Sequence, residues 1–573
     1  MDPHAENDKN DNADSNSRRK FLKTVTAMGI ATAAYSAVPT LSVTPAEAAE
    51  IGPVSAHKRR EQAFRLRLEA ALANKNQPIA SQPTNSDEDI YSNRIGSFSK
   101  TLPHNSLGEV DPAAYDALLA ALTSGVSSDF EKIPLGGTAK LANPQASYAF
   151  DMLGPDGHHP VLPAAPALSS AQEASEIAED YWAALTRDVP FNDYGTNSVI
   201  ADAAANLSSF SDFRGPKEHG QVTPDTLFRG FTDGDLTGPY ISQFLWKNIP
   251  YGSTTVVQKY KTAAPGTDYM TSYSDWLNIQ NGGPAAAFVF DPTPRYIRSG
   301  RDMSEWLHRD FSYQGPLSAA LILLSLGPSA LDQNNPYTKY QKQNGGITLG
   351  SQAILDLLAR VSDLALKACW FQKWLVHRRV RPEEFGGLVH NHIMGKASYP
   401  LPSELISGPG RTVLARVFST FGSYLLPQAY SEGCPTHPAY PAGHATLAGA
   451  CGTVLKWFFN ESLPIPSPVV ASSDGSTLNT YTGPTLTVGG ELNKLASNAS
   501  IPRDTAGVHW RTDGEQGMLL GEAMAIGMLQ DMARTNTEQF AGLSLTKFDG
   551  TTITITGVSD DDDEGRHEGG KRD

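Results

Sequence analysis

Apolar residues recur at intervals of three to four positions in several long stretches of the chain. The stretches with this spacing are residues 57–73, 112–123, 170–185, 235–245, 303–326, 350–380, 410–424, 443–459 and 514–535. Such spacing places the apolar side chains on one face of a helix, where they can be buried together. The pattern therefore predicts a mainly α-helical fold.

Patterns typical of strands are few and short. The best candidates are TTITITGV near Thr551 and TYTGPTLTV near Thr480, because runs of β-branched residues favour extended backbone. The segments between the predicted helices are rich in Gly, Pro, Asn and Asp, which indicates long loops. After the predicted helix 57–73, Pro, Asn and Ser dominate up to about Leu107, and we interpret this stretch as an extended arm over the surface or over a partner subunit.

These features divide the chain into four parts. Residues 1–49 are a leader, residues 50–330 an N-terminal helical region that includes the arm, and residues 331–545 a C-terminal helical region. Residues 546–573 form a tail. Part of it is expected to be disordered, because the block Asp560–Glu564 carries like charges and no apolar residue.

The leader has the features of an export signal. Arg18 and Arg19 precede an apolar stretch from Val25 to Val38, and Ala46-Glu47-Ala48 supplies small residues for cleavage. A twin-arginine pair followed by such a stretch is typical of the Tat pathway. A short membrane anchor is the alternative, but the apolar run is shorter than the about 20 residues that span a bilayer. We therefore expect a protein exported to the periplasm or secreted, with no membrane span.

The composition excludes some classes of protein. The 573 residues carry a formal net charge of −15, which argues against a nucleic-acid binder, since phosphate backbones require a basic surface. An anion site must then be a local cationic pocket. Only three cysteines occur, Cys369, Cys434 and Cys451, too few for a disulfide scaffold. One disulfide remains open, and Cys434 and Cys451 are expected to pack rather than to react.

Basic residues cluster at the end of the predicted helix 350–380. The segment from Lys373 to Pro382 reads KWLVHRRVRP. At about 100° per residue, Lys373, His377 and Arg381 form one drifting stripe, so that two long cationic side chains can converge. Pro382 is expected to stop the helix at Arg381 or just before it. Taken alone, the cluster could also be the basic face of a surface helix.

A turn that contains proline and glycine leads directly into an apolar helix at Gly443. The free backbone N–H groups at such a helix start bind oxyanions, and Gly443 would let an anion approach the backbone closely. His444 would lie in the first turn beside that anion. An ordinary helix cap with a packed histidine is the alternative.

The third cluster contains Arg503, His509 and Asp513. His509 and Asp513 are four residues apart, so that on a helix the carboxylate can orient the imidazole. Arg503 can reach back toward the same point. A surface His–Asp pair is the alternative. Together, however, the three clusters supply three cations, the Gly443 N–H and two histidines, which suits the binding of one tetrahedral oxyanion.

The order of these clusters resembles that of a known family. K-x7-RP, P-A-G-H and R-x5-H-x3-D resemble the pattern shared by vanadium haloperoxidases and the type-2 phosphatidic acid phosphatase superfamily. Within it, HRRVRPEEFGG, HPAYPAGHA and HWRTDGE closely resemble the algal and cyanobacterial bromoperoxidases. Further segments, such as NPQASYAFDMLGPDGH and YWAALTRDVPFNDYG, extend the resemblance over roughly His57 to Ala541.

The resemblance implies a fold of two four-helix bundles, with the site in residues 331–545. His509 would bind vanadium axially, Asp513 would support it, and His444 would be the acid–base residue. The residues implied to hold the vanadate oxygens are Lys373, Arg381, Gly443 and Arg503.

The implied reaction is the oxidation of a halide ion by hydrogen peroxide to hypohalous acid, which halogenates an organic acceptor. Vanadate would act as a Lewis acid, with Lys373 polarising the peroxide. The resemblance also implies a homo-oligomer, either a dimer or a dodecamer like the algal relatives. Related algal enzymes bind calcium, for which the loop residues Asp332, Asn334 and Asn335 offer oxygen ligands.

Three positions set the chain apart within this family. His437 matches the histidine typical of algal bromoperoxidases, whereas Trp370 matches the tryptophan of fungal chloroperoxidases, where algal enzymes usually have arginine. We therefore expect bromide to be the main substrate, with some chloride activity. Ala442 replaces the serine of the family pattern P-S-G-H, whose hydroxyl donates to a vanadate oxygen. We expect weaker retention of vanadate without loss of the site.

Two other functions compete with this one. An exported acid phosphatase would use the same pocket, with His509 as the nucleophile that forms a phosphohistidine and His444 as the acid for the leaving group. A non-enzymatic oxyanion-binding or shell protein is the second alternative. It is disfavoured because the histidines include both an acid–base type and a ligand type.

Overall fold

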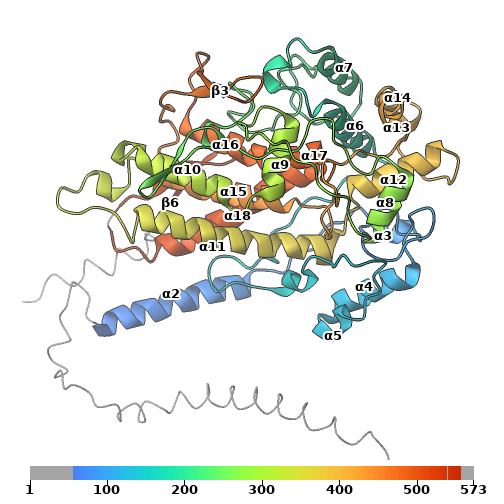
Figure 1. The fold of residues 1–573 in the computed structure, drawn as a ribbon. Coiled ribbons are helices and arrows are strands. Elements are labelled where there is room, and N and C mark those ends of the chain that lie inside the picture. Colours follow the sequence, from blue (N-terminus) through green and yellow to red (C-terminus); the bar gives the residue numbers. More distant parts are fainter. Residues whose placement is uncertain (1–55, 539, 557–573) are drawn as a thin grey trace, which may run out of the picture. The chain divides into compact units, whose positions relative to one another are not determined.

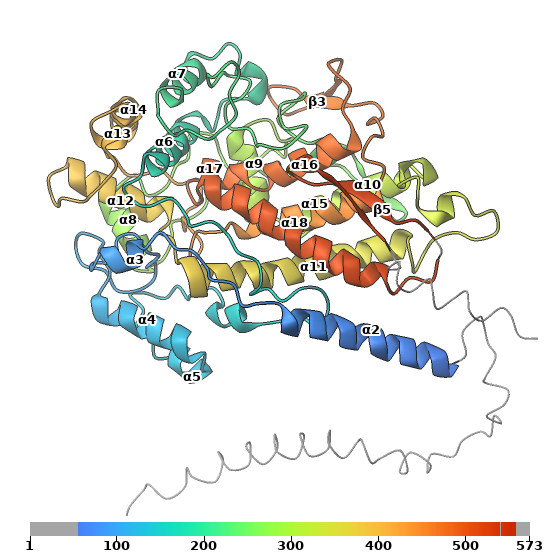
Figure 2. The same cartoon turned by 180° about the vertical axis from the view of Figure 1, so that it is seen from behind.

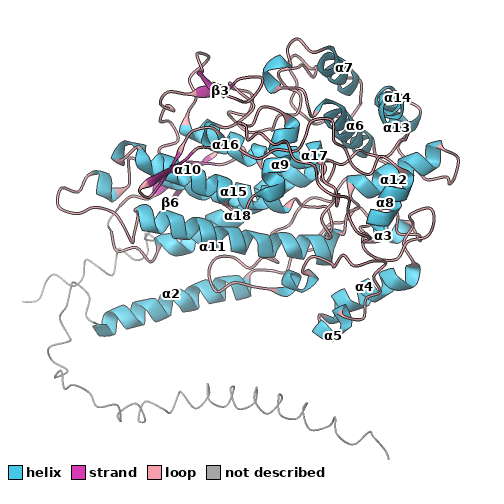
Figure 3. Ribbon diagram, in the orientation of Figure 1, coloured by secondary structure: helices cyan, strands magenta, loops and turns pink. Residues whose placement is uncertain are grey.

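The computed structural model describes residues 56–538 and 540–556 (Figure 1, and from behind in Figure 2). Helices dominate these residues, and the strands are few and short (Figure 3). The prediction of a mainly α-helical fold is confirmed. The leader of residues 1–49 and the acidic block of the tail lie outside the described residues.

The elements keep the names of Figure 1. The α-helices are α2 (Ala56–Asn76), α3 (Asp87–Ile90), α4 (Pro112–Ser124), α5 (Ser127–Phe130), α6 (Ala171–Thr186), α7 (Ser198–Leu207), α8 (Tyr273–Gln280), α9 (Gly300–Arg309), α10 (Gln314–Ser325), α11 (Ser351–Phe371), α12 (Pro382–Ile393), α13 (Ser403–Ile406), α14 (Gly410–Phe421), α15 (Gly443–Phe458), α16 (Val488–Asn498), α17 (Ile501–Thr505) and α18 (Arg511–Ala533). The strands form antiparallel pairs: β1 (Ile249–Tyr251) with β2 (Thr254–Val256), β3 (Val469–Ala471) with β4 (Leu478–Thr480), and β5 (Leu543–Thr546) with β6 (Thr552–Ile555).

By its contacts the chain divides between Leu72 and Ala73 into two units, of which the structure describes residues 56–72 in the first and residues 73–538 and 540–556 in the second. The predicted division at residues 330–331 falls inside the second unit, where one hydrophobic cluster contains residues from both sides of it. That division stays a prediction. Among the described residues, none of the helices has the length and apolar character needed to cross a membrane.

Helices α11, α15 and α18 lie side by side and contribute to the larger hydrophobic core (Figure 2). Helices α15 and α18 approach each other closely because glycines lie at their contact. A Cβ atom at Gly449 would lie 2.3 Å from the carbonyl oxygen of Met518, and one at Gly521 would lie 1.9 Å from that of Thr446. Only glycine allows such an approach. This close contact fixes the N-terminal ends of α15 and α18 relative to each other.

A second hydrophobic core lies among α6, α7, α12, α13 and α14. Helix α6 is buried over nearly its whole length and begins with a capping serine, because the Ser170 side chain accepts from the Glu173 N–H. Helix α7, which the apolar pattern did not predict, is capped in the same way by Asn197. The two groups of helices agree with the two helical bundles that the resemblance implied.

Two of the predicted helices differ from the structure, one of them absent and the other divided. Residues 235–245 are irregular except for a 3₁₀ turn at Gln243–Leu245, because Gly238-Pro239 interrupts the pattern. The predicted helix 303–326 is divided between α9 and α10. Pro316 lies in the first turn of α10, the part of a helix in which proline is tolerated.

The predicted arm is partly internal. Phe98 and Leu102 are buried, and the Lys100 ammonium donates to the carbonyl oxygens of Glu432 and Cys434. The interpretation of this stretch as an arm over the surface is therefore wrong for these residues. Apolar positions within this Pro- and Ser-rich segment are too few to show a helical or strand period, so no local pattern indicated that Phe98 and Leu102 are buried.

Candidate active site

Lys373 and Arg381 do not lie on one helix. Helix α11 ends at Phe371 and passes into a single π-helical segment, Gln372–His377, which carries Lys373. Arg378 then adopts the left-handed conformation with φ 39°. Pro382 begins α12 at its first position and leaves Arg381 as the residue before it, because proline suits the first turn of a helix. The predicted continuous stripe through His377 is wrong, although the two cations still converge.

Two backbone carbonyl groups hold the ammonium group of Lys373 in place. It is fully buried and donates to the carbonyl oxygens of Pro438 (2.8 Å) and Ala439 (2.7 Å). Burial lowers the pKa of Lys373 to about 7, and the neighbouring charges of Arg381 and Arg503 act in the same direction. A bound anion would offset this cost, because an opposite charge favours the protonated amine.

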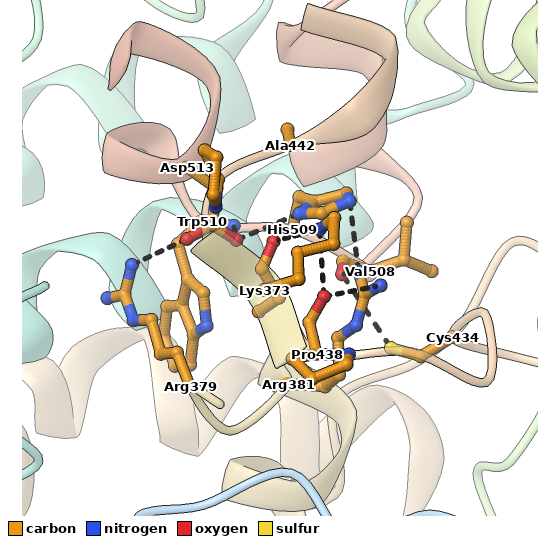
Figure 4. Close-up of polar contacts among 12 residues, drawn as sticks. Lys373, Arg379, Arg381, Cys434, Pro438, Ala442, Val508, His509, Trp510 and Asp513 are labelled. Atoms are coloured by element: carbon orange, nitrogen blue, oxygen red, sulfur yellow. Dashed lines mark hydrogen bonds and ion pairs between the residues drawn. The ribbon is translucent and has the colours of Figure 1, made fainter. Parts of the chain in front are cut away.

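The guanidinium of Arg381 joins the first cluster to the other two. Its Nη2 donates to the carbonyl oxygen of His437 (2.8 Å). Its Nη1 donates to that of Val508 (2.6 Å) and lies 3.0 Å from His509 Nε2 (Figure 4). Since Arg381 is fully buried, these contacts fix the position of its guanidinium between His437 and His509.

His509 and Asp513 form the predicted pair, although His509 lies before the helix. Helix α18 begins at Arg511, and Asp513 in its first turn accepts from His509 Nδ1 at 2.8 Å (Figure 4). The same carboxylate oxygen accepts from the Trp510 N–H at 3.2 Å. Burial, and then the charges of Arg381 and Lys373, hold the pKa of His509 well below its usual range. The ring is therefore neutral, with its proton on Nδ1 and a lone pair on Nε2.

Helix α15 begins at Gly443, as predicted, and places His444 in its first turn. The side chain of His444 is 34% exposed, and its Nε2 lies 3.2 Å from Asp310 Oδ1. Ala442 is the buried residue just before the helix and provides no side-chain cap. The first N–H groups of α15 have no partner within the helix, which is the property an oxyanion site needs.

Trp370 and His437, the two positions from which the halide preference was predicted, lie against each other. The rings of Trp370 and His437 are 4.9 Å apart between centroids. The Trp370 indole N–H donates to the Ala142 carbonyl oxygen at 3.1 Å, which fixes the ring. A Cβ atom on Gly443 would lie 3.4 Å from the Trp370 ring. The tryptophan therefore forms the wall of the site next to the start of α15.

The predicted residues line a cavity of about 260 Å³ or lie next to it. The residues that line it are Asp310, Ser312, Leu366, Trp370, Pro435, His437, Gly443, His444, Leu447, Arg503 and His509. Lys373 and Arg381 lie behind this lining, where Arg381 contacts both His437 and His509. Asp513 lies behind His509. All predicted site residues thus belong to one site, although only some face the open space.

Sequence reasoning missed several members of the site. Asp310 lies far from the motifs in sequence and reaches His444 through the end of α9. The Tyr430 hydroxyl accepts from Arg503 Nη1 at 3.2 Å. Arg379 bonds to Asp513, and only its place inside the RRVR run could have drawn attention to it. The cysteines Cys369, Cys434 and Cys451 are free and buried, which confirms that Cys434 and Cys451 pack.

The geometry fits an oxyanion that also takes one nitrogen ligand. Three cations and the amide end of α15 supply N–H donors, and His509 supplies one unprotonated nitrogen. Arg503 Nε is buried and has no hydrogen-bond partner among the described residues. Phosphate and vanadate both satisfy the donors, but vanadium also accepts a nitrogen ligand, since imidazole binds transition metals readily. The site therefore fits vanadate.

Known proteins of similar sequence and structure agree with this site. A family model described as the VCPO second helical-bundle domain matches residues 361–537. The chain is 36% identical to the vanadium-dependent bromoperoxidase of Ascophyllum nodosum over 535 residues, which cover 88% of this chain and 95% of the relative. It is 33% identical to that of Corallina pilulifera over 591 residues, with 87% and 98% covered.

A solved structure matches over a similar range. The second vanadate-dependent bromoperoxidase from Ascophyllum nodosum, solved as a homohexamer, superposes with a TM-score of 0.85 at 33% identity. The match covers 91% of this chain and 94% of that chain. Because these relatives are similar over nearly their full length and the site has the geometry described above, the chain belongs to the vanadium-dependent bromoperoxidase family.

Proposed function

We propose that this protein binds vanadate in the 260 Å³ cavity and oxidises bromide with hydrogen peroxide to hypobromous acid, which brominates an organic acceptor. The observation that carries the proposal is the neutral His509, held by Asp513 and faced by the Arg381 guanidinium. When bound, vanadate is a Lewis acid that activates peroxide without a change in its own oxidation state.

The residues of the chain have distinct tasks in this reaction. Lys373, Arg381 and Arg503 would balance the charge of the bound anion and hold its oxygens. Asp513 keeps the proton of His509 on Nδ1, so that Nε2 stays available as a ligand. His444, at the mouth of the cavity and paired with Asp310, holds or releases a proton beside the reacting oxygens.

The acid phosphatase alternative is disfavoured. It would use the same cations, but the relatives that cover nearly the whole length of this chain are vanadium-dependent bromoperoxidases.

Bromination of a phenol dye tests the proposal directly. Metal-free protein should be inactive and should gain bromide- and peroxide-dependent activity when vanadate is added. His509→Ala should fail to gain it, because the nitrogen ligand is gone. Hydrolysis of a phosphate monoester with no bromination in the presence of vanadate would favour the phosphatase.

A second variant separates binding from proton transfer. His444→Ala should lower the rate of bromination about 100-fold or more, the usual size of an acid–base contribution. It should leave vanadate binding nearly intact, since Lys373, Arg381 and Arg503 remain. Kinetics and equilibrium dialysis with vanadate measure the two effects, and an equal loss of both would assign His444 to binding instead.

The mixed pair of Trp370 and His437 suggests some turnover of chloride in addition to bromide. We propose that chloride is oxidised slowly, and most readily at mildly acidic pH. Chloride-dependent chlorination of the same dye by vanadate-loaded protein tests this. No turnover of chloride at any pH at which bromide is oxidised would refute it.

Export and assembly are further parts of the proposal. The twin arginines Arg18 and Arg19 support export by the Tat pathway, and the mature N-terminus should then lie near Ala49. The homohexamer formed by the solved relative supports a homo-oligomer; a dimer and a dodecamer are the sizes that the family resemblance implies.

A structural calcium has less support. The Oδ1 atoms of Asp332 and Asn335 accept from the N–H groups of Asn334 and Tyr337, which is ordinary turn bonding. Within residues 56–538 and 540–556, no group of three or more His, Cys, Asp or Glu could hold a metal ion. Calcium binding by this loop stays a prediction, which a rise of the melting temperature on addition of calcium would support.

A further inference from the structure

A chain of buried charged groups lies behind His509, and the reaction described above does not use it. Asp513 accepts from His509 with Oδ2 and from Arg379 Nη1 with Oδ1, both at 2.8 Å (Figure 4). Nη2 of Arg379 donates to Glu173 at 2.5 Å and to Glu176 at 3.2 Å. These two glutamates lie one turn apart on α6, more than 300 residues before His509 in sequence.

Each member of this chain is held by further contacts. The guanidinium of Arg379 lies over the ring of Trp510, with 4.8 Å between its Cζ and the ring centroid. The Trp510 indole N–H donates to the Val380 carbonyl oxygen at 2.9 Å. Glu176 accepts from Gln172 Nε2 at 2.9 Å and from the Thr512 hydroxyl. These contacts therefore hold the guanidinium group of Arg379 in one position and one orientation.

The arginine is needed for both its charge and its shape. Asp513, Glu173 and Glu176 are buried carboxyl groups that would otherwise face one another. A planar guanidinium donates to carboxylates on two sides at once, which the point charge of a lysine does less well. Removing one partner of a buried ion pair leaves the other charge unpaired, so that the remaining groups rearrange.

We propose that Arg379 is a positioning residue for the reaction: anchored on α6 by Glu173 and Glu176, it fixes Asp513 and thereby the tautomer and ring direction of His509. The inference rests on the proposed function for the role of His509 as a vanadium ligand. Its consequence is that helix α6, which does not reach the cavity, determines how well Nε2 of His509 is presented.

If Arg379 has this role, its loss should affect the binding of vanadate and the binding of phosphate differently. Both anions use the donors Lys373, Arg381 and Arg503, which Arg379 does not contact. Only vanadate also bonds to His509, and that bond depends on the tautomer and direction of the ring. Loss of Arg379 should therefore weaken the binding of vanadate much more than that of phosphate.

Calorimetric titration of the metal-free full-length protein with each anion is the test. In Arg379→Lys, vanadate should bind about 10- to 100-fold more weakly, the range found when a partner of a metal ligand is lost, while phosphate binding changes far less. The vanadium-51 NMR shift of bound vanadate should also move. Glu173→Ala, which leaves Arg379 in the chain, should change the ratio of the two affinities in the same direction by a smaller factor.

Arg511→Lys is the matched control. Arg511 also bridges α18 and α6, is buried, and donates to Glu179 at 2.8 and 2.5 Å, but it bonds to neither His509 nor Asp513. It should lower stability and leave the ratio unchanged. The inference is overturned if the ratio in Arg379→Lys or Glu173→Ala equals that of the unmodified protein, or if Arg511→Lys changes it equally. If the unmodified protein does not bind vanadate, the proposed function fails as well.

Discussion

At the residue scale, the site concentrates positive charge where the rest of the chain is acidic. Lys373 and Arg381 have lowered pKa values because they are buried beside each other and near Arg503. Carbonyl oxygens of Pro438, Ala439 and Val508 partly compensate them. Such a site gains from binding an anion, since the anion removes the repulsion among the cations.

Ala442 is the residue at which restoring the family pattern should strengthen the site. Ala442→Ser adds a hydroxyl that can donate to the oxyanion, and a hydrogen bond contributes about 0.5–1.5 kcal/mol, more to a charged partner. The same oxygen can accept from the first turn of α15, where serine caps are favoured. Vanadate affinity and the melting temperature should both rise. An unchanged or lowered affinity in calorimetric titration would contradict this.

His308 supports the site from one side and makes stability depend on pH. Its ring stacks on Tyr430 with 4.0 Å between centroids, and its two nitrogens face Glu305 and Glu432. Burial lowers the pKa of His308, but the hydrogen bonds and charges of these two carboxylates outweigh it and the pKa is raised. The pairing therefore stabilises the fold fully below the unfolded pKa of about 6.5 and loses its effect as pH rises through the higher folded pKa.

His308→Gln should accordingly destabilise the protein more at pH 6 than at pH 9. Urea unfolding of both proteins at the two pH values measures the difference. A destabilisation that is the same at both values would show that the charge of His308 contributes nothing.

At the element scale, the close contact of α15 and α18 positions the two ends that build the site. Gly443 and His444 begin α15, and Asp513 lies in the first turn of α18. Glycines along the contact let the two backbones approach to a distance that side chains would prevent. A substitution in the middle of this contact should therefore displace the N-terminal ends of α15 and α18, where the site residues lie.

Gly521→Ala should separate the two helices, because the added Cβ atom would lie 1.9 Å from the Thr446 carbonyl oxygen. We expect a loss of about 1–3 kcal/mol in the free energy of unfolding, typical of overpacking, and weaker vanadate binding. Gly452→Ala on α15 is the control. Its Cβ atom would find no atom closer than 3.8 Å, so stability should stay the same or rise by up to about 1 kcal/mol. Equal effects of the two substitutions in urea unfolding would refute this account.

At the scale of the whole molecule, the proposed homo-oligomer would add to the stability of each chain. Assembly stabilises folded subunits by mass action, so that the melting temperature depends on protein concentration. Light scattering after gel filtration should give a mass that is a multiple of the 61.5 kDa chain, less the leader. A monomer with a melting temperature independent of concentration would contradict it.

The sequence by itself determined the kinds of groups in the site and several of the helices. The spacing of apolar residues predicted α2, α4, α6, α14, α15 and α18 within a few residues, because each helix has a local period and local signals at its ends. The arrangement of Lys, Arg and His residues was readable for the same reason. Each cluster is contiguous in sequence, so that the types of residue it offers can be recognised without the rest of the fold.

Only the tertiary structure decided which groups support these clusters. Asp310 reaches His444, and Glu173 reaches Arg379, from segments 134 and 206 residues away. Contacts between distant segments leave no period or motif in the sequence, and a buried carboxylate looks like a surface one until its partner is placed. The path of the backbone from Lys373 to Arg381 was decided in the same way: local rules favoured a helix, and packing selected the π turn and a new start at Pro382.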